Sequence, residues 1–231
     1  MVVFRRLGLV GVGAAAVGLL CAGCGDSGGL ESAGPTPTAV GPERLWPTLP
    51  PATRAADDYG AGETAVVKGV EVPGGRLREV DPVTIVRARV AAAPDDYEDI
   101  AGAVAKCSGG ASGCPVLEAY YRDLTGDGHD DLLVAVRAPN RQAYLQTYTY
   151  SGGKLTQIMD DKDAVINVHL AGRNIVVRAA ADLAGYEYRT SWSYDRHQKA
   201  MLPTRDEILR TGSPSASSPP PSTPTPSPSR S

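Results

Sequence analysis

The sequence predicts an α+β fold in which one or two N-terminal helices pack on an antiparallel β-meander, flanked by disordered ends. The chain has 231 residues, of which 42% are hydrophobic and 21% charged, enough to build one globular domain. Apolar residues recur every three or four positions before residue 107, and from Val116 onward they alternate with polar ones. Both ends are rich in Pro, Gly and Ser. We therefore expect a globular α+β domain over residues 57–211.

The first segment has the proportions of an export signal. Arg5 and Arg6 are followed by an uncharged stretch from Leu7 to Leu20, which is shorter than the roughly 20 apolar residues of a bilayer span. Residues 20–24, Leu-Cys-Ala-Gly-Cys, resemble the lipobox of bacterial lipoproteins, except that an aliphatic residue usually stands where Cys21 does. The resemblance implies a signal peptide over 1–23 and a lipid on Cys24. An ordinary secreted protein cut near Ala22, an uncleaved anchor and twin-arginine export are the alternatives.

The segments that flank the domain show no strand or helix period. Residues 24–56 mix Gly, Pro and Thr, so after the lipidated cysteine we expect a flexible tether that lifts the domain off the lipid headgroups. Residues 212–231 are almost entirely Ser, Pro and Thr and contain too little apolar surface to order themselves. The sequence predicts a disordered tail there.

One short strand and two helices should open the domain. Residues 66–72 alternate and end at Pro73-Gly74-Gly75, which indicates a strand followed by a turn. Asp81 followed by Pro82 is a typical helix start, and the apolar residues after it lie on one face. A second helical stripe begins after Pro94 and should end before Gly109.

Two cysteines remain in the domain, Cys107 and Cys114. The residues between them are Ser, Gly and Ala, so the segment can close a tight ring, and an oxidising exterior would favour a disulfide. A metal half-site or a redox pair is the alternative. Neither fits well, because the spacing is not that of a C-x-x-C motif and no histidine lies nearby in the sequence.

The segment from Asp123 to Leu132 is the most distinctive motif. It resembles the calcium loops of FG-GAP and dockerin-like domains, whose alternate oxygen ligands converge where a glycine permits a sharp turn. The resemblance implies a structural calcium ion as cofactor. Its ligands would be these residues: Asp123, Thr125, Asp127, the backbone carbonyl of His129, and Asp131. The pattern occurs once, and Val134 replaces the bidentate acid of an EF-hand. The alternative is a hairpin turn closed by Asp side chains.

Six strands should follow this motif as a meander. The alternating segments are separated by turn signals such as Ser151-Gly152-Gly153, and they are residues 132–136, 143–150, 155–159, 165–170, 175–181 and 186–194. In the last of them, four aromatic residues fall on one face. This row predicts core packing, with a stacking platform for sugar or peptide as the alternative.

Charge and motif content weigh against two classes of function. A formal charge of -3 supplies no basic field, which argues against a nucleic-acid partner. The histidines, His129, His169 and His197, are scattered, and no nucleophile motif, dinucleotide fingerprint or P-loop occurs, so we expect a protein that is not an enzyme. A wall hydrolase whose residues converge only in space is the open alternative.

Taken together, the lipobox, the tether, the single Cys107–Cys114 ring, the Asp-rich loop and the Ser/Pro/Thr tail resemble the surface lipoproteins of Streptomyces-type actinomycetes. Among these the chain resembles the cell-envelope-stress lipoproteins. The resemblance implies a lipid-anchored protein on the extracellular face of the cell membrane. It would act as a non-enzymatic negative modulator of envelope-stress signalling, through contact with a sensor kinase or another envelope protein. The alternative is a calcium-stabilised module that binds a cell-wall glycan or peptide.

Overall fold

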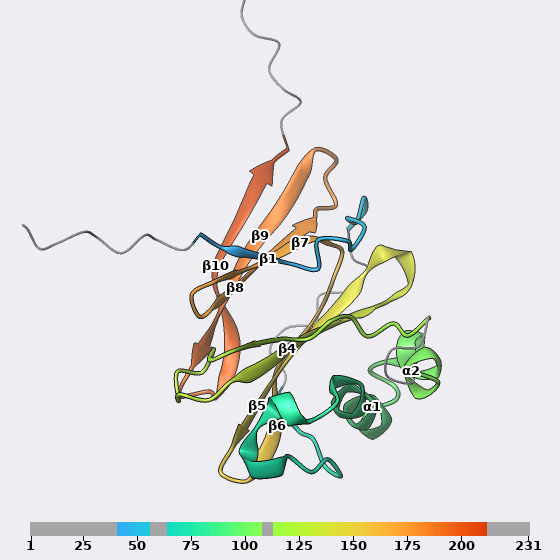
Figure 1. The fold of residues 1–231 in the computed structure, drawn as a ribbon. Coiled ribbons are helices and arrows are strands. Elements are labelled where there is room, and N and C mark those ends of the chain that lie inside the picture. Colours follow the sequence, from blue (N-terminus) through green and yellow to red (C-terminus); the bar gives the residue numbers. More distant parts are fainter. Residues whose placement is uncertain (1–40, 56–63, 108–112, 212–231) are drawn as a thin grey trace, which may run out of the picture. The chain divides into compact units, whose positions relative to one another are not determined.

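Two five-stranded antiparallel sheets and two helices make up the part of the chain described by the computed structural model (Figure 1), residues 41–55, 64–107 and 113–211. The first sheet has the order β1-β7-β8-β9-β10 and the second the order β2-β6-β5-β4-β3. This is the α+β class that the sequence predicts. No helix in these three ranges is long and apolar enough to cross a membrane.

The strands of the two sheets are as follows. The first sheet contains β1 (Glu43–Leu45), β7 (Val165–Ala171), β8 (Asn174–Ala180), β9 (Tyr186–Asp195) and β10 (Ala200–Arg210). The second contains β2 (Ala65–Val66), β3 (Tyr120–Arg122), β4 (Asp131–Arg137), β5 (Ala143–Ser151) and β6 (Lys154–Asp163). Short 3-10 turns lie at η1 (Pro73–Gly75), η2 (Leu77–Glu79) and η3 (Pro139–Arg141).

The first helix begins where the sequence predicts, and the second begins a few residues later than predicted, at Glu98. The helix α1 (Pro82–Ala92) has Asp81 as its N-cap, and the Asp81 carboxylate accepts a hydrogen bond from the N–H of Val83. The helix α2 (Glu98–Ala105) buries Ile100 and Val104. Both helices lie beside the second sheet (Figure 1), and their apolar faces share one core cluster with Leu132, Val134 and Val136 of β4.

A second core lies between the two sheets. Alternate residues of β4 and β5, among them Leu133 and Leu145, contact Val168, Ile175 and Trp192 of the first sheet. The second sheet is therefore buried on both faces, which explains why six of the seven residues of β4 are buried. The order of layers is helices, second sheet, first sheet.

The structure corrects the single predicted meander. β6 and β7 follow each other directly in the chain but belong to different sheets, with Ala164 at the passage between them. Trp192 and Tyr194 of the aromatic row of β9 pack in the core, as the sequence predicts, but the opposite face of the strand is not wholly solvated. Trp192 lies in the core between the sheets, whereas Glu187, which we expected on a solvated face, is only 4% exposed.

The predicted tether over residues 24–56 is wrong in its second half. Glu43–Leu45 pair with β7, and Leu45 and Trp46 are buried. Ala52 is buried too, and its N–H donates to the carbonyl of Val165. Residues 24–40, the signal peptide over 1–23 and the tail over 212–231 lie outside the described residues. The expected strand over 66–72 reduces to β2, and β3 and β10 were not foreseen.

Candidate functional site

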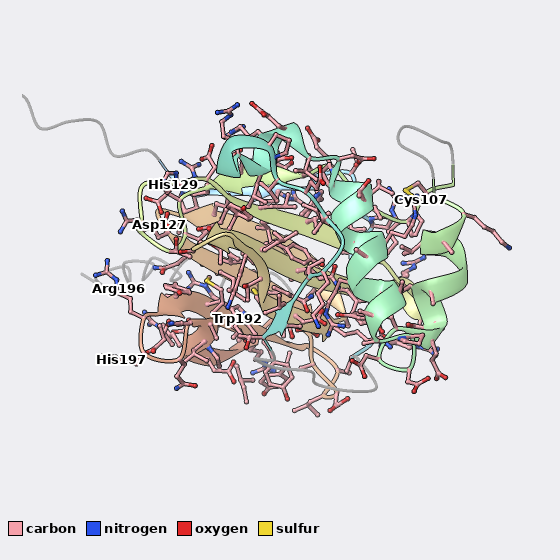
Figure 2. The ribbon with its side chains drawn as sticks, turned by 90° about the horizontal axis from the view of Figure 1, so that it is seen from below. Cys107, Asp127, His129, Trp192, Arg196 and His197 are labelled. Carbon is pink, nitrogen blue, oxygen red and sulfur yellow. A yellow bond between two sulfur atoms is a disulfide. The ribbon has the colours of Figure 1, made fainter. Side chains whose placement is uncertain are left out.

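The Asp-rich motif forms the loop between β3 and β4, at one edge of the domain. Gly126 and Gly128 adopt positive φ angles of 77° and 88°, which lets the chain turn sharply, and Gly128 stands at the position where the calcium-loop pattern has glycine. Figure 2 shows Asp127 and His129 at this edge, on the same side of the view as Arg196 and His197 and opposite Cys107.

The carboxylates of this loop are engaged by its own backbone. Asp123 Oδ1 accepts hydrogen bonds from the N–H groups of Gly126 at 2.6 Å and Asp127 at 3.1 Å, and Oδ2 accepts one from Gly128 at 3.3 Å. Asp127 Oδ1 accepts a hydrogen bond from the N–H of His129 at 2.9 Å. These are the contacts of a turn that Asp side chains close.

Asp131 is the anchor of the loop. It is 1% exposed at the start of β4, and its Oδ2 accepts hydrogen bonds from the N–H groups of Leu124 and Thr125, both at 2.8 Å. Burial raises the pKa of Asp131, while these N–H groups act in the opposite direction by favouring the carboxylate. The side chain therefore fixes the beginning of the loop to the strand that follows it.

A guanidinium from the other sheet lies against the loop. Arg173, in the turn between β7 and β8, forms an ion pair with Asp123 Oδ2 at 3.4 Å. A Cβ at Gly126 would lie 2.5 Å from Arg173 Nη1 and 3.4 Å from Arg196 Nη2, so the loop backbone, Arg173 and Arg196 are close neighbours. The cations beside the Asp-rich loop in this structure are thus arginine side chains.

The predicted calcium ligands can be tested for fit against these contacts. In the three described ranges, no group of three or more His, Cys, Asp and Glu side chains is placed so that it could hold a metal ion. Asp123 and Asp131 direct oxygens at backbone N–H groups, and Asp127 is exposed and bonds to His129. The geometry fits the Asp-closed turn better than a calcium site, and calcium binding stays a prediction.

Sequence reasoning did not foresee the arginines. Arg173 lies in a segment that was recognised only as a turn, and it is 50 positions from Asp123. No local pattern says that the turn of one sheet lies beside a loop of the other, because that contact depends on how the two sheets stack. The predicted lipidation site, Cys24, lies outside the described residues.

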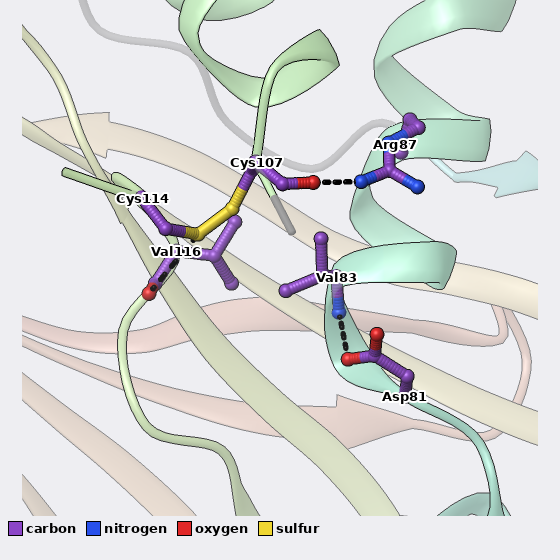
Figure 3. The surroundings of a disulfide bond; sticks show 6 residues. All are labelled: Asp81, Val83, Arg87, Cys107, Cys114 and Val116. Atoms are coloured by element: carbon purple, nitrogen blue, oxygen red, sulfur yellow. Dashed lines mark hydrogen bonds between the residues drawn. A yellow bond between two sulfur atoms is a disulfide. The ribbon is translucent and has the colours of Figure 1, made fainter. Parts of the chain in front are cut away.

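The two cysteines of the domain form a disulfide on the helix side of the molecule (Figure 3). Cys107 follows α2 and is 4% exposed, and its Cα lies 4.8 Å from that of Cys114. The guanidinium of Arg87 on α1 donates a hydrogen bond to the carbonyl oxygen of Cys107. The disulfide thus links the end of α2 to the segment that leads into β3.

The three histidines are separated in the fold. His129 lies in the Asp-rich loop, His169 on β7 and His197 in the turn after β9. His197 and His129 lie at the same edge (Figure 2), while the pKa of His169 is lowered by burial and by nearby arginines.

Comparison with protein-family models, with curated proteins and with solved structures finds no match to this chain.

Proposed function

We propose that this chain is a lipid-anchored lipoprotein of the extracellular membrane face that modulates envelope-stress signalling by contact with another envelope protein. The observation that carries the proposal is the Cys107–Cys114 disulfide, because such bonds persist in oxidising compartments outside the cytosol. It agrees with the export signal and the lipid-bearing Cys24 that the N-terminal residues predict.

A modulator of this kind acts by occupancy. Bound to the outer domain of a sensor kinase, it holds the inactive state only if it binds that state more tightly than the active one. A lipid anchor raises its effective concentration at the membrane, so modest affinity suffices. This function needs no chemical step on a substrate, so we propose that the protein is not an enzyme.

Deletion of the gene tests this function. The basal output of an envelope-stress reporter should rise, because the inactive state of the sensor loses its ligand, while wall-targeting antibiotics should still induce the pathway. Expression of the wild-type chain from a second locus should restore the low output. An unchanged reporter in the deletion strain, with and without antibiotic, would remove the basis of the proposal.

A calcium-stabilised module for a wall glycan or peptide is the second candidate. The observation that favours it is the hydroxyl of Thr125, one of the predicted calcium ligands, which is buried beside the carboxylate of Asp131 and forms no hydrogen bond of ordinary geometry among the described residues. Binding to the native state alone would raise the melting temperature in proportion to the logarithm of the calcium concentration.

The melting temperature of the purified full chain separates the two interpretations of the loop. Because backbone N–H groups and Arg173 already engage the carboxylates, we expect the same melting curve in chelator and in millimolar calcium. A rise with calcium that disappears in Asp127→Ala, and persists in a variant at the exposed Asp182, would instead establish the calcium module.

A further inference from the structure

The outer face of the first sheet contains a recess lined by arginines and a histidine. Val177 and Leu170 point into the core between the sheets, so the residues next to them on β7 and β8 point the other way. On this outer face lies a depression of about 540 Å³ whose lining includes Pro42, His169, Val176, Arg178, Arg189 and Leu209. We call this recess the basic basin.

Basic side chains lie opposite each other on neighbouring strands at the basic basin. Arg178 of β8 lies directly opposite Arg189 of β9, and Arg44 of β1 lies directly opposite His169 of β7. Direct cross-strand pairs of like charge destabilise a sheet. The Arg178–Arg189 pair therefore needs a compensating partner.

The acidic residues nearby compensate only in part. Glu187 is 4% exposed and accepts hydrogen bonds from Arg178, while Glu207 of β10 is shared between Arg189 and Arg205. The carboxylates on this face are thus already used to hold the arginines in position. Held in this way, the guanidinium groups are pre-organised for an incoming anion.

Shape and exposure favour a ligand that protrudes into the recess over a flat surface. The side chains of Arg178 and Arg189 are 37% and 45% exposed, and each is held at the recess by an ion pair to a neighbouring strand, so they are positioned for a ligand that enters the recess. Three further residues of the lining, Pro42, Val176 and Leu209, are apolar. A chain with both carboxylate and aliphatic side chains matches this mixture.

We propose that the basic basin binds an acidic peptide segment of the protein partner, its carboxylates pairing with Arg44, Arg178 and Arg189 and its aliphatic side chains lying on Val176 and Leu209. This inference rests on the proposed function and names the surface that makes the contact.

The pKa of His169 should report whether a ligand occupies the basic basin. Burial and the positive charges of Arg44, Arg178 and Arg189 lower its pKa. A bound carboxylate would offset these charges and raise that pKa. The charged groups around it come from three strands: Arg44 on β1, Arg178 on β8, and Glu187 and Arg189 on β9.

The test uses the full chain and a synthetic peptide in which glutamate and valine alternate, with its glutamine counterpart as control. Titration by fluorescence anisotropy should show binding of the glutamate peptide only, and the NMR titration of His169 should shift to higher pH on binding. The double variant Arg44→Gln/Arg189→Gln should weaken binding about tenfold. Arg178 is left intact, because its removal would strand the buried Glu187.

A charge-matched control separates a site from a general field effect. Arg76 and Arg78 are 66% and 58% exposed and lie in the segment before α1, so Arg76→Gln/Arg78→Gln makes the same change in net charge elsewhere. This control should bind the peptide like wild type. Equal losses in both double variants, or no peptide binding to wild type, would overturn the proposal.

The same proteins can be tested for two other occupants of the basic basin, an anionic membrane surface and a second copy of the chain. Binding to anionic lipid vesicles that exceeds peptide binding would assign the basic basin to the membrane surface. Self-association of wild type that Arg44→Gln/Arg189→Gln abolishes would assign it to a second copy. Either result overturns the peptide proposal.

The reporter strain then separates failure of this inference from failure of the proposed function. If deletion raises basal output and the Arg44→Gln/Arg189→Gln allele fails to lower it again, the basin is the contact surface. Full repression by that allele refutes the basin and leaves the modulator intact. No effect of deletion refutes the modulator, while the peptide titration still decides the basin.

Discussion

Buried carboxyl groups on β6 make the stability of the folded chain depend on pH. Asp161 and Asp163 are 5% and 7% exposed, and both lie opposite core residues of β5 on the face turned toward the first sheet. Burial raises the pKa of Asp161 well above its usual range and that of Asp163 to about 6, and neighbouring acids add to the effect. The folded state therefore favours the protonated form of both groups.

The sign of the resulting pH dependence follows from linkage. Because the pKa of Asp163 is higher in the folded than in the unfolded chain, its contribution to stability is complete below about pH 4 and is lost as the pH rises through about 6. The pKa difference corresponds to about 3 kcal/mol at most. We expect Asp163→Asn to be more stable than wild type at pH 7 and to lose less stability between pH 4 and pH 7.

Urea unfolding of both proteins across this pH range measures the effect. Asn keeps an acceptor for the N–H of Ala164, which donates to Asp163 Oδ1 at 2.7 Å, so the local backbone contact survives. The exposed Asp182 supplies the control, since Asp182→Asn should leave the pH dependence unchanged. If the free energy of unfolding depended on pH in the same way in wild type and in Asp163→Asn, this carboxyl would ionise equally well in the folded and unfolded chains.

Among the secondary-structure elements, the two helices are fastened to the second sheet by polar as well as apolar contacts. Arg89 of α1 is 5% exposed, and its Nε donates to Gln157 Oε1 on β6 at 2.6 Å. Its guanidinium lies 4.9 Å from the ring centre of Tyr97, whose hydroxyl donates to Asp160. Since a buried cation is costly without partners, this network fixes the position of α1 on the sheet.

The disulfide fixes the other end of the helical layer, and its removal tests that role. In Cys107→Ser/Cys114→Ser, the unfolded chain gains the freedom that the ring denied it, so the free energy of unfolding should fall by about 2–3 kcal/mol. Urea unfolding measures this decrease in the free energy of unfolding, and wild type treated with reductant should show the same decrease. Equal stability of oxidised wild type and the double variant would mean that the ring stabilises nothing.

For the molecule as a whole, the proposed lipid anchor on Cys24 would determine where the domain works. Cys24→Ala should release the protein from the membrane fraction and abolish palmitate incorporation, because the two acyl chains of a diacylated cysteine are what give stable anchoring. Cys21→Leu is the matched control, since it changes the neighbouring cysteine to the aliphatic residue usual in the motif and should remain anchored. Membrane retention of Cys24→Ala, with no palmitate on wild type, would refute the lipoprotein assignment.

The local features of this protein could be predicted from the sequence alone because local residues produce them. Asp81 and Pro82 start α1 through a cap and a preset backbone angle, and period-two alternation identifies β4, β5, β7, β8 and β9. The spacing of Cys107 and Cys114, with only small residues between them, allowed the prediction of a disulfide-closed ring. The glycines of the Asp-rich loop likewise predicted a sharp turn.

Contacts between distant segments were decided only by the tertiary structure. Residues 43–45 were predicted to belong to the tether, because three residues are too few to show the alternation of a strand. They form a strand because they pair with β7. The passage from β6 to β7 divides one alternating run between two sheets, and their stacking brings Arg173 to Asp123. It also leaves the arginines of β1, β8 and β9 together on an outer face. Alternation tells which residues share a face of a strand, but only the order and stacking of the strands determine what that face meets.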